Sequence, residues 1–111
     1  PQDMILLQVN GQVTSRVTQA LVDEQLRLCL LQGQGSFSLT PNHPIEAGKQ
    51  RFRSLHVSVS EGTIWLFAEH QNQPGAGLAK AVQEHEARDV LSAWLYRKAP
   101  DTSFWTPKAR K

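Results

Sequence analysis

The sequence contains few of the residues that usually carry covalent or redox chemistry. Among its 111 residues are one cysteine, one methionine and one tyrosine. The single cysteine, Cys29, excludes an intrachain disulfide, and its place in a leucine-rich run predicts a buried thiol in a reducing compartment. We therefore expect a cytoplasmic protein.

Strong charge and long apolar runs are also missing. The formal net charge is +2, which is too small for electrostatics alone to make the chain a strong binder of polyanions. No apolar run approaches the roughly 18 residues that a membrane-spanning helix requires, so we expect no membrane association. The length and a composition of 40% apolar and 20% charged residues predict a single globular domain over residues 1–100 and a basic tail over residues 101–111.

Motifs that would fix a reaction, a metal or a cofactor are absent as well. His85 and Asp89 share a helix face in a pattern that resembles HExxH with Asp as the last residue, but no third ligand is evident. No serine lies in a nucleophile elbow, and the glycines lack the spacing of a phosphate-binding loop. We therefore predict no catalytic residue, no metal and no cofactor. The rival hypothesis is an enzyme whose site gathers His43, Glu46 and His56.

What the sequence does contain is a hairpin with two different faces. Two alternating runs, 52–60 and 63–70, are separated by Glu61-Gly62, which suits a two-residue turn because glycine tolerates a positive φ. Neighbouring residues of a strand point to opposite faces, so this register places the aliphatic side chains together on a core face. A slip of one residue would mix the two faces, and the register is therefore well specified.

The second face of this hairpin is aromatic. The same register sets Ser58 opposite Trp65 and His56 opposite Phe67, and it extends the face to Phe52. One helix covers only one face of a sheet, so the aromatic face needs a cover from the N-terminal strands, a second protomer or a ligand.

The rest of the chain predicts an α+β fold. We expect a mainly antiparallel sheet of five to six strands, a short early helix and a long amphipathic C-terminal helix over residues 78–98. A partly open small barrel, with that helix as a plug, is the alternative architecture. The further expected strands are residues 4–9, 12–17 and 36–40, and the expected irregular segments are residues 41–50 and 71–77.

Residues 15–32 have two interpretations. One is a short helix over residues 18–25 followed by a strand over residues 26–31. The other is one continuous helix that ends at Gly33. We favour the first, because the apolar residues of a continuous helix would surround its axis instead of forming one stripe.

We interpret the chain as a non-catalytic binding or adaptor module. It would recognise a protein partner, or a second copy of itself, through the aromatic face and the tail. The expected binding residues are Phe52, His56, Trp65 and Phe67 on the face and Phe104 and Trp105 in the tail.

A single-stranded nucleic-acid-binding domain is the alternative function. Bases would stack on the aromatic side chains while cations contact the phosphates. The expected cations, which would also suit an acidic partner, are Lys49, Arg51, Arg53, Lys108, Arg110 and Lys111.

Overall fold

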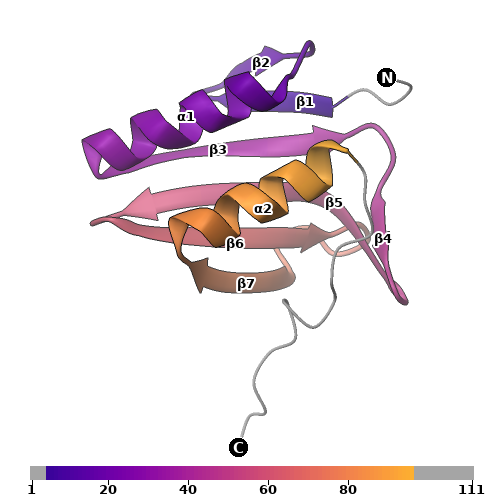
Figure 1. Cartoon of the computed structure of the whole chain (residues 1–111). Coiled ribbons are helices and arrows are strands. Elements are labelled where there is room, and N and C mark those ends of the chain that lie inside the picture. The colour runs from indigo at the N-terminus through magenta and orange to yellow at the C-terminus, as the bar shows by residue number, and fades with distance from the viewer. Residues whose placement is uncertain (1–4, 97–111) are drawn as a thin grey trace, which may run out of the picture.

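A seven-stranded antiparallel sheet forms the centre of the protein, whose computed structural model describes residues 5–96. The elements in chain order are β1 (Ile5–Val9), β2 (Gln12–Thr14), α1 (Gln19–Gln32), β3 (Gln34–Pro41), β4 (Ile45–Ala47), β5 (Gln50–Ser60), β6 (Thr63–His70), β7 (Gly77–Val82) and α2 (Glu84–Leu95). The strand order is β2-β1-β3-β5-β6-β7, with β4 paired to the start of β5. Both helices lie on the same side of the sheet, α1 over β3 and α2 over β6 (Figure 1).

The hairpin of β5 and β6 has the predicted register. Glu61 and Gly62 form its turn with φ angles of 50° and 79°, and Ser58 lies opposite Trp65. The aliphatic side chains of both strands point toward the helices and are buried. The sheet is open, with β2 and β7 at its two ends, so the barrel alternative is wrong.

Phe52 departs from the predicted register. The pairing shifts between Phe52 and Ser54, where Arg53 is the extra residue of a bulge. A bulge reverses the parity of the strand, so Phe52 lies on the helix side, where it is 1% exposed and its ring centroid is 6.5 Å from that of Trp94. Phe52 is therefore a core residue, and its assignment to the aromatic face is wrong.

Helix α1 is continuous, so the interpretation as a short helix followed by a strand is also wrong. Its buried residues, Val22, Leu26 and Cys29, follow the i, i+4, i+7 spacing of one helix face. Gly33 ends the helix with a φ of 78°, which glycine adopts without steric strain. Exposed leucines such as Leu31 widen the apolar pattern and obscure this face in the sequence.

The C-terminal helix is shorter than predicted. Helix α2 has 12 residues and begins after Gln83, which forms a capping box with Glu86. Residues 78–82, which we expected in the helix, belong instead to strand β7 and pair with β6. A short apolar run of this kind fits both periodicities, and the neighbouring strand decides between them. Strand β4 likewise occupies part of a segment that we expected to be irregular.

Side chains from both helices and the sheet share one hydrophobic core. Trp94 of α2 is the largest fully buried side chain. At the surface between the helices, Arg88 of α2 donates a hydrogen bond of 3.1 Å to Asp23 of α1. Neither helix in residues 5–96 is long and apolar enough to cross a membrane.

Two leucines of α1 test this packing. Leu26→Ala removes a fully buried side chain and should lower the free energy of unfolding by about 2–5 kcal/mol. Leu31→Ala is the matched control, because this side chain is 75% exposed and its loss should change the same quantity by less than about 0.5 kcal/mol. Urea denaturation followed by circular dichroism measures both values. Equal losses would contradict the observed orientation of α1.

Candidate binding face of the sheet

The sheet face opposite the helices is not covered by any element within residues 5–96 (Figure 1). We call it the open face. The strand register arranges its side chains in three rows that cross the sheet. The rows are Ser36, Ser58, Trp65 and Ala81; Gln8, Ser38, His56, Phe67 and Ala79; and Leu6, Thr40, Ser54, Glu69 and Gly77.

An apolar ridge stands on this face along β6. Trp65 is 46% exposed because its cross-strand neighbours, Ser58 and Ala81, are small. Phe67 follows on the same face and is half-buried. The rings therefore rise above a floor of short side chains, where a partner can reach them.

A hydrogen-bonded pair borders the ridge. His56 Nε2 lies 2.9 Å from Glu69 Oε1, and the His56 ring stacks on Phe67 with centroids 5.8 Å apart. Glu69 Oε2 accepts a second hydrogen bond of 2.9 Å from the Gly75 N–H in the turn before β7. The hydrogen bond from His56, and then that from Gly75, lowers the pKa of the Glu69 carboxyl. Glu69 is therefore held as an anion that fixes both the imidazole and the turn.

Apart from the exposed Leu6 and Val13, the other half of the open face carries hydroxyl, amide and imidazole groups. Hydroxyl groups of Thr40 and Ser54 lie 3.0 Å apart and satisfy one another. Beside them is a shallow pocket of about 330 Å³, lined on this face by Gln8, Ser36, Ser38, His56 and Ser58. This surface therefore offers neutral hydrogen-bonding groups.

The predicted binding residues are only partly brought together. His56, Trp65 and Phe67 share the open face, whereas Phe52 lies in the core. The tail residues Phe104, Trp105, Lys108, Arg110 and Lys111 lie outside the described residues.

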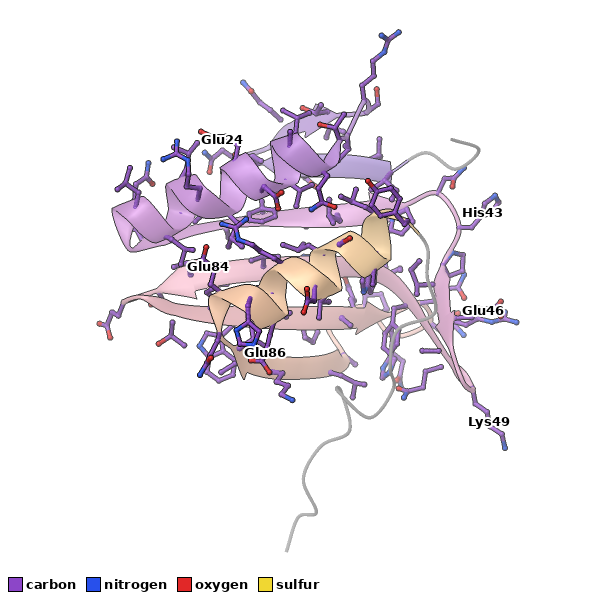
Figure 2. The ribbon with its side chains drawn as sticks, viewed as in Figure 1. Glu24, His43, Glu46, Lys49, Glu84 and Glu86 are labelled. Carbon is purple, nitrogen blue, oxygen red and sulfur yellow. The ribbon has the colours of Figure 1, made fainter. Side chains whose placement is uncertain are left out.

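The predicted cations are dispersed. Arg53, the extra residue of the bulge, is close enough to Glu69 to lower the pKa of that carboxyl. Arg51 instead pairs with Glu46 across β4 and β5, at 3.5 Å. Lys49 lies at the far tip of the β4–β5 hairpin, where Figure 2 shows it pointing away from the sheet. The cations of the basic cluster therefore do not form an unpaired row, because Arg51 and Arg53 each lie near a carboxylate and Lys49 points away from the sheet.

The enzyme hypothesis required His43, Glu46 and His56 to converge. Glu46 lies beside Arg51, and Arg51 precedes His56 by five residues on β5, which corresponds to about 16 Å of strand. His56 is already paired with Glu69. These side chains do not form one site. Within residues 5–96, moreover, no three His, Cys, Asp or Glu side chains gather closely enough to hold a metal ion.

Several residues of the open face were not anticipated, among them Leu6, Gln8, Ser36 and Ser38. Within each strand, the alternation of these residues with apolar residues in the sequence indicates that Leu6 and Gln8 share a face and that Ser36 and Ser38 share a face. Nothing local shows that β3 lies between β1 and β5, however, and only this order places them beside His56.

The lowered pKa of the Glu69 carboxyl predicts that the stability of the fold depends on pH. A lowered carboxyl pKa stabilises the fold above about pH 4.3, the ordinary pKa of glutamate, and this stabilisation is lost as the pH falls through the lowered pKa. Glu69→Gln should therefore destabilise the protein near pH 6, and the difference from wild type should shrink toward pH 3. Urea denaturation across this range measures the difference. Glu61→Gln, in the exposed turn, is the control for the loss of a glutamate charge, and an equal trend in both variants would contradict the role of Glu69.

Comparison with known proteins adds no identification. No family model, curated protein or solved structure matches the chain. The function is therefore argued from the geometry of the sheet.

Proposed function

We propose that the protein is a binding module that recognises a protein partner through the open face. The observation that carries this proposal is the exposed Trp65, which stands with Phe67 on a sheet face that neither helix covers. Tryptophan is enriched among the residues that dominate binding energy in protein interfaces. Apolar side chains rimmed by polar groups are typical of such interfaces.

The charge of the open face supports a protein partner over a polyanion. The part of this face formed by β3 and β5 carries hydroxyl groups and His56, which is hydrogen-bonded to Glu69. Arg53 lies beside this carboxylate, and Arg51 pairs with Glu46. A nucleic-acid interface needs several cations aligned along the phosphates, and this face does not present such a row. The predicted role of the tail as a second anchor remains part of the proposal.

Replacement of Trp65 tests the proposal. Trp65→Ala removes an exposed ring, so it should lower the free energy of unfolding by less than about 1 kcal/mol. The same change should weaken partner binding by about 2 kcal/mol or more if Trp65 is an anchor. A loss of about 3–5 kcal/mol in stability would instead identify Trp65 as a core residue.

Site-specific photo-crosslinking identifies the partner. A photoreactive amino acid at Ala81, next to Trp65 across the strands, should form one dominant adduct in the source cells. That adduct should disappear when Trp65→Ala is added. The same photoreactive group at Leu31, which is exposed on α1, is the matched control and should not form it. An adduct that persists with Trp65→Ala would contradict the proposal, and an adduct with a second copy of this chain would identify the partner as itself.

Single-stranded nucleic acid is the second candidate, because Trp65 and Phe67 offer two rings for base stacking with Arg53 nearby. A labelled oligonucleotide at low salt should then bind, and its affinity should fall steeply as salt is added. Trp65→Ala should weaken that binding by about 1–3 kcal/mol. Fluorescence anisotropy measures both effects, and absence of binding at low salt would exclude this candidate.

A further inference from the structure

The edge of β3 is only half covered by its neighbour β1. Strand β3 begins at Gln34, but the last residue that β1 pairs with is Ser38, opposite Gln8. At Asn10 the chain turns away into β2, with a φ of 51°. Residues 34–36 are therefore paired with β5 on one side and with no strand on the other, among the strands of the described chain. This stretch spans about 10 Å.

The register shows which backbone groups this edge exposes. A two-residue turn is closed by a hydrogen-bonded pair, here Ser60 and Thr63, so alternate residues of β5 direct their N–H and C=O toward β6 and toward β3. Val59 directs its groups toward β3 and is paired with Gly35. Gly35 therefore bonds toward β5, and Gln34 and Ser36 direct their N–H and C=O outward.

The hairpin of β1 and β2 independently shows that Gln34 and Ser36 direct their backbone groups outward. Val9 and Gln12 close the Asn10-Gly11 turn, so Val9 directs its backbone groups toward β2 and Gln8 directs its groups toward Ser38 of β3. Even-numbered residues of β3 thus bond toward the side of β1. Beyond the end of β1, this places two backbone donors and two acceptors at a free edge.

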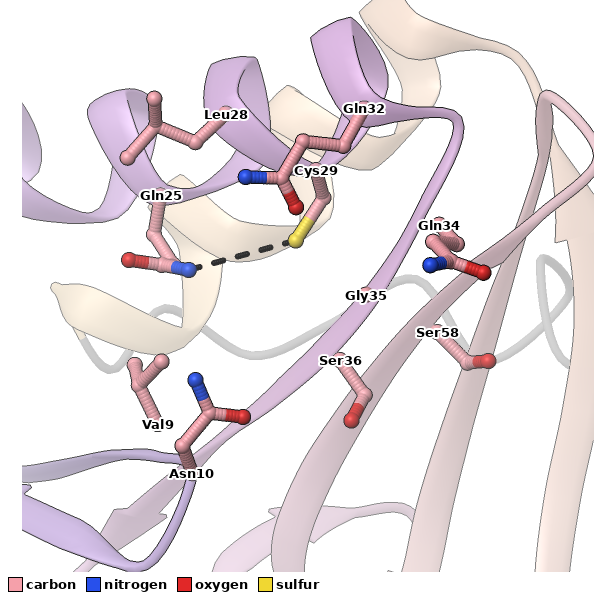
Figure 3. Close-up of a pocket in the computed structure, with 10 residues that line it drawn as sticks. All are labelled: Val9, Asn10, Gln25, Leu28, Cys29, Gln32, Gln34, Gly35, Ser36 and Ser58. Carbon is pink, nitrogen blue, oxygen red and sulfur yellow. Dashed lines mark hydrogen bonds between the residues drawn. The ribbon is translucent and has the colours of Figure 1, made fainter.

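A cavity of about 670 Å³ lies along this free edge (Figure 3). Helix α1 forms its roof, the start of the Asn10-Gly11 turn forms one end, and Figure 3 shows the side chains of Gln25 and Gln32 reaching into it from the helix. Gly35 passes so close under the roof that a side chain there would meet Cys29 Sγ at 2.7 Å. The cavity is thus formed by a strand edge, a helix and the start of a turn.

The lining of this cavity is neutral and rich in amides. It includes four carboxamide side chains, those of Asn10, Gln25, Gln32 and Gln34, but no acidic or basic residue. Burial raises the pKa of the Cys29 thiol, which keeps it uncharged. Within residues 5–96, only Gln25 of the four carboxamides has a side-chain hydrogen bond, a long one of 4.0 Å to Cys29 Sγ. Each carboxamide offers both a donor and an acceptor, which is the hydrogen-bonding pattern of a peptide group.

We propose that this edge site binds an extended segment of another polypeptide, which adds to β3 as a strand in line with β1. The outward N–H and C=O groups of Gln34 and Ser36 form hydrogen bonds with the backbone of this segment. The carboxamides of Gln25 and Gln32 on α1 form hydrogen bonds with further peptide groups of the segment. The segment's residue opposite Gly35 points under α1, so it is uncharged and small enough for the cavity. This site lies at the strand edge and does not depend on the role proposed for Trp65.

Random linear peptides displayed on phage are the probe for this site. Peptides selected on the full chain should bind with dissociation constants that rise at least about tenfold in Ser36→Pro, which removes an outward N–H and places a ring at the edge. Gln32→Trp, which fills the cavity from the helix and leaves the strand unchanged, should have the same effect. Leu31→Trp is the matched control on the next residue of α1, and its binding should equal that of wild type.

Amide hydrogen exchange gives a second measurement. In the free chain the N–H groups of Gln34 and Ser36 should exchange fast while that of Gly35 exchanges slowly. A selected peptide at saturation should slow the first two. Slow exchange of Gln34 and Ser36 in the free chain would overturn the proposal, because the edge would then be occupied by this chain itself.

Three further outcomes would also overturn it: no peptide with this dependence is selected, the selected peptides bind Ser36→Pro and Gln32→Trp as tightly as wild type, or their binding is lost in Trp65→Ala instead. The last outcome would place the peptide on the open face and would support the proposed function alone. Conversely, if the peptides still bind the edge of β3 in Trp65→Ala, the edge proposal is supported, even if the open face has no partner.

Discussion

The pairing of β5 with β6 across the Glu61-Gly62 turn is the constraint on which the rest of the structure depends. The turn has positive φ angles at both residues, and this conformation fixes which residues face each other. One register then determines three properties together. It collects the aliphatic side chains under the helices, leaves Trp65 on the opposite face, and decides which backbone groups of β3 bond toward β5.

The position of the helices follows from the separation of the aliphatic face of the sheet from the face that carries Trp65. Helices α1 and α2 each present a small set of buried residues, and the aliphatic face of β3, β5 and β6 is the surface that both can bury against. The ion pair between Arg88 and Asp23 joins them at a half-exposed position, where such a pair contributes at most about 1 kcal/mol. Hydrophobic burial, and not this ion pair, therefore places both helices on one side, and the opposite face is left without a cover from residues 5–96.

The sequence was a good guide wherever one short-range rule decided the structure. The turn at Glu61-Gly62 and the pairing of Ser58 with Trp65 followed from alternation and glycine chemistry alone. Phe52 was misplaced because a bulge at Arg53 reverses the parity, and no pattern in the strand announces that bulge.

The elements that were misassigned depend on neighbours distant in the sequence. The run from Gly77 to Val82 becomes a strand because β6 has an edge to pair with. The leucine-rich run of α1 becomes one helix because Val22, Leu26 and Cys29 find the sheet beneath them. The site shows the same division: the aromatic ridge on β6 could be predicted, whereas its polar floor depends on the order of β1, β3 and β5.

The open face and the free edge of β3 adjoin one another, and this adjacency decides whether the two proposed binding events would exclude one another. Asn10, Ser36 and Ser58 line both the cavity under α1 and the shallow pocket on the open face. In an added strand, the residues opposite Gln34 and Ser36 would point to the open face, because side chains in an antiparallel pair share a face with their partners. A strand at the edge would thus extend the polar floor outward and leave the ridge on β6 accessible, since β5 separates β3 from β6. The two proposed binding events are therefore compatible with one another, whether they involve two segments of one partner or two different chains.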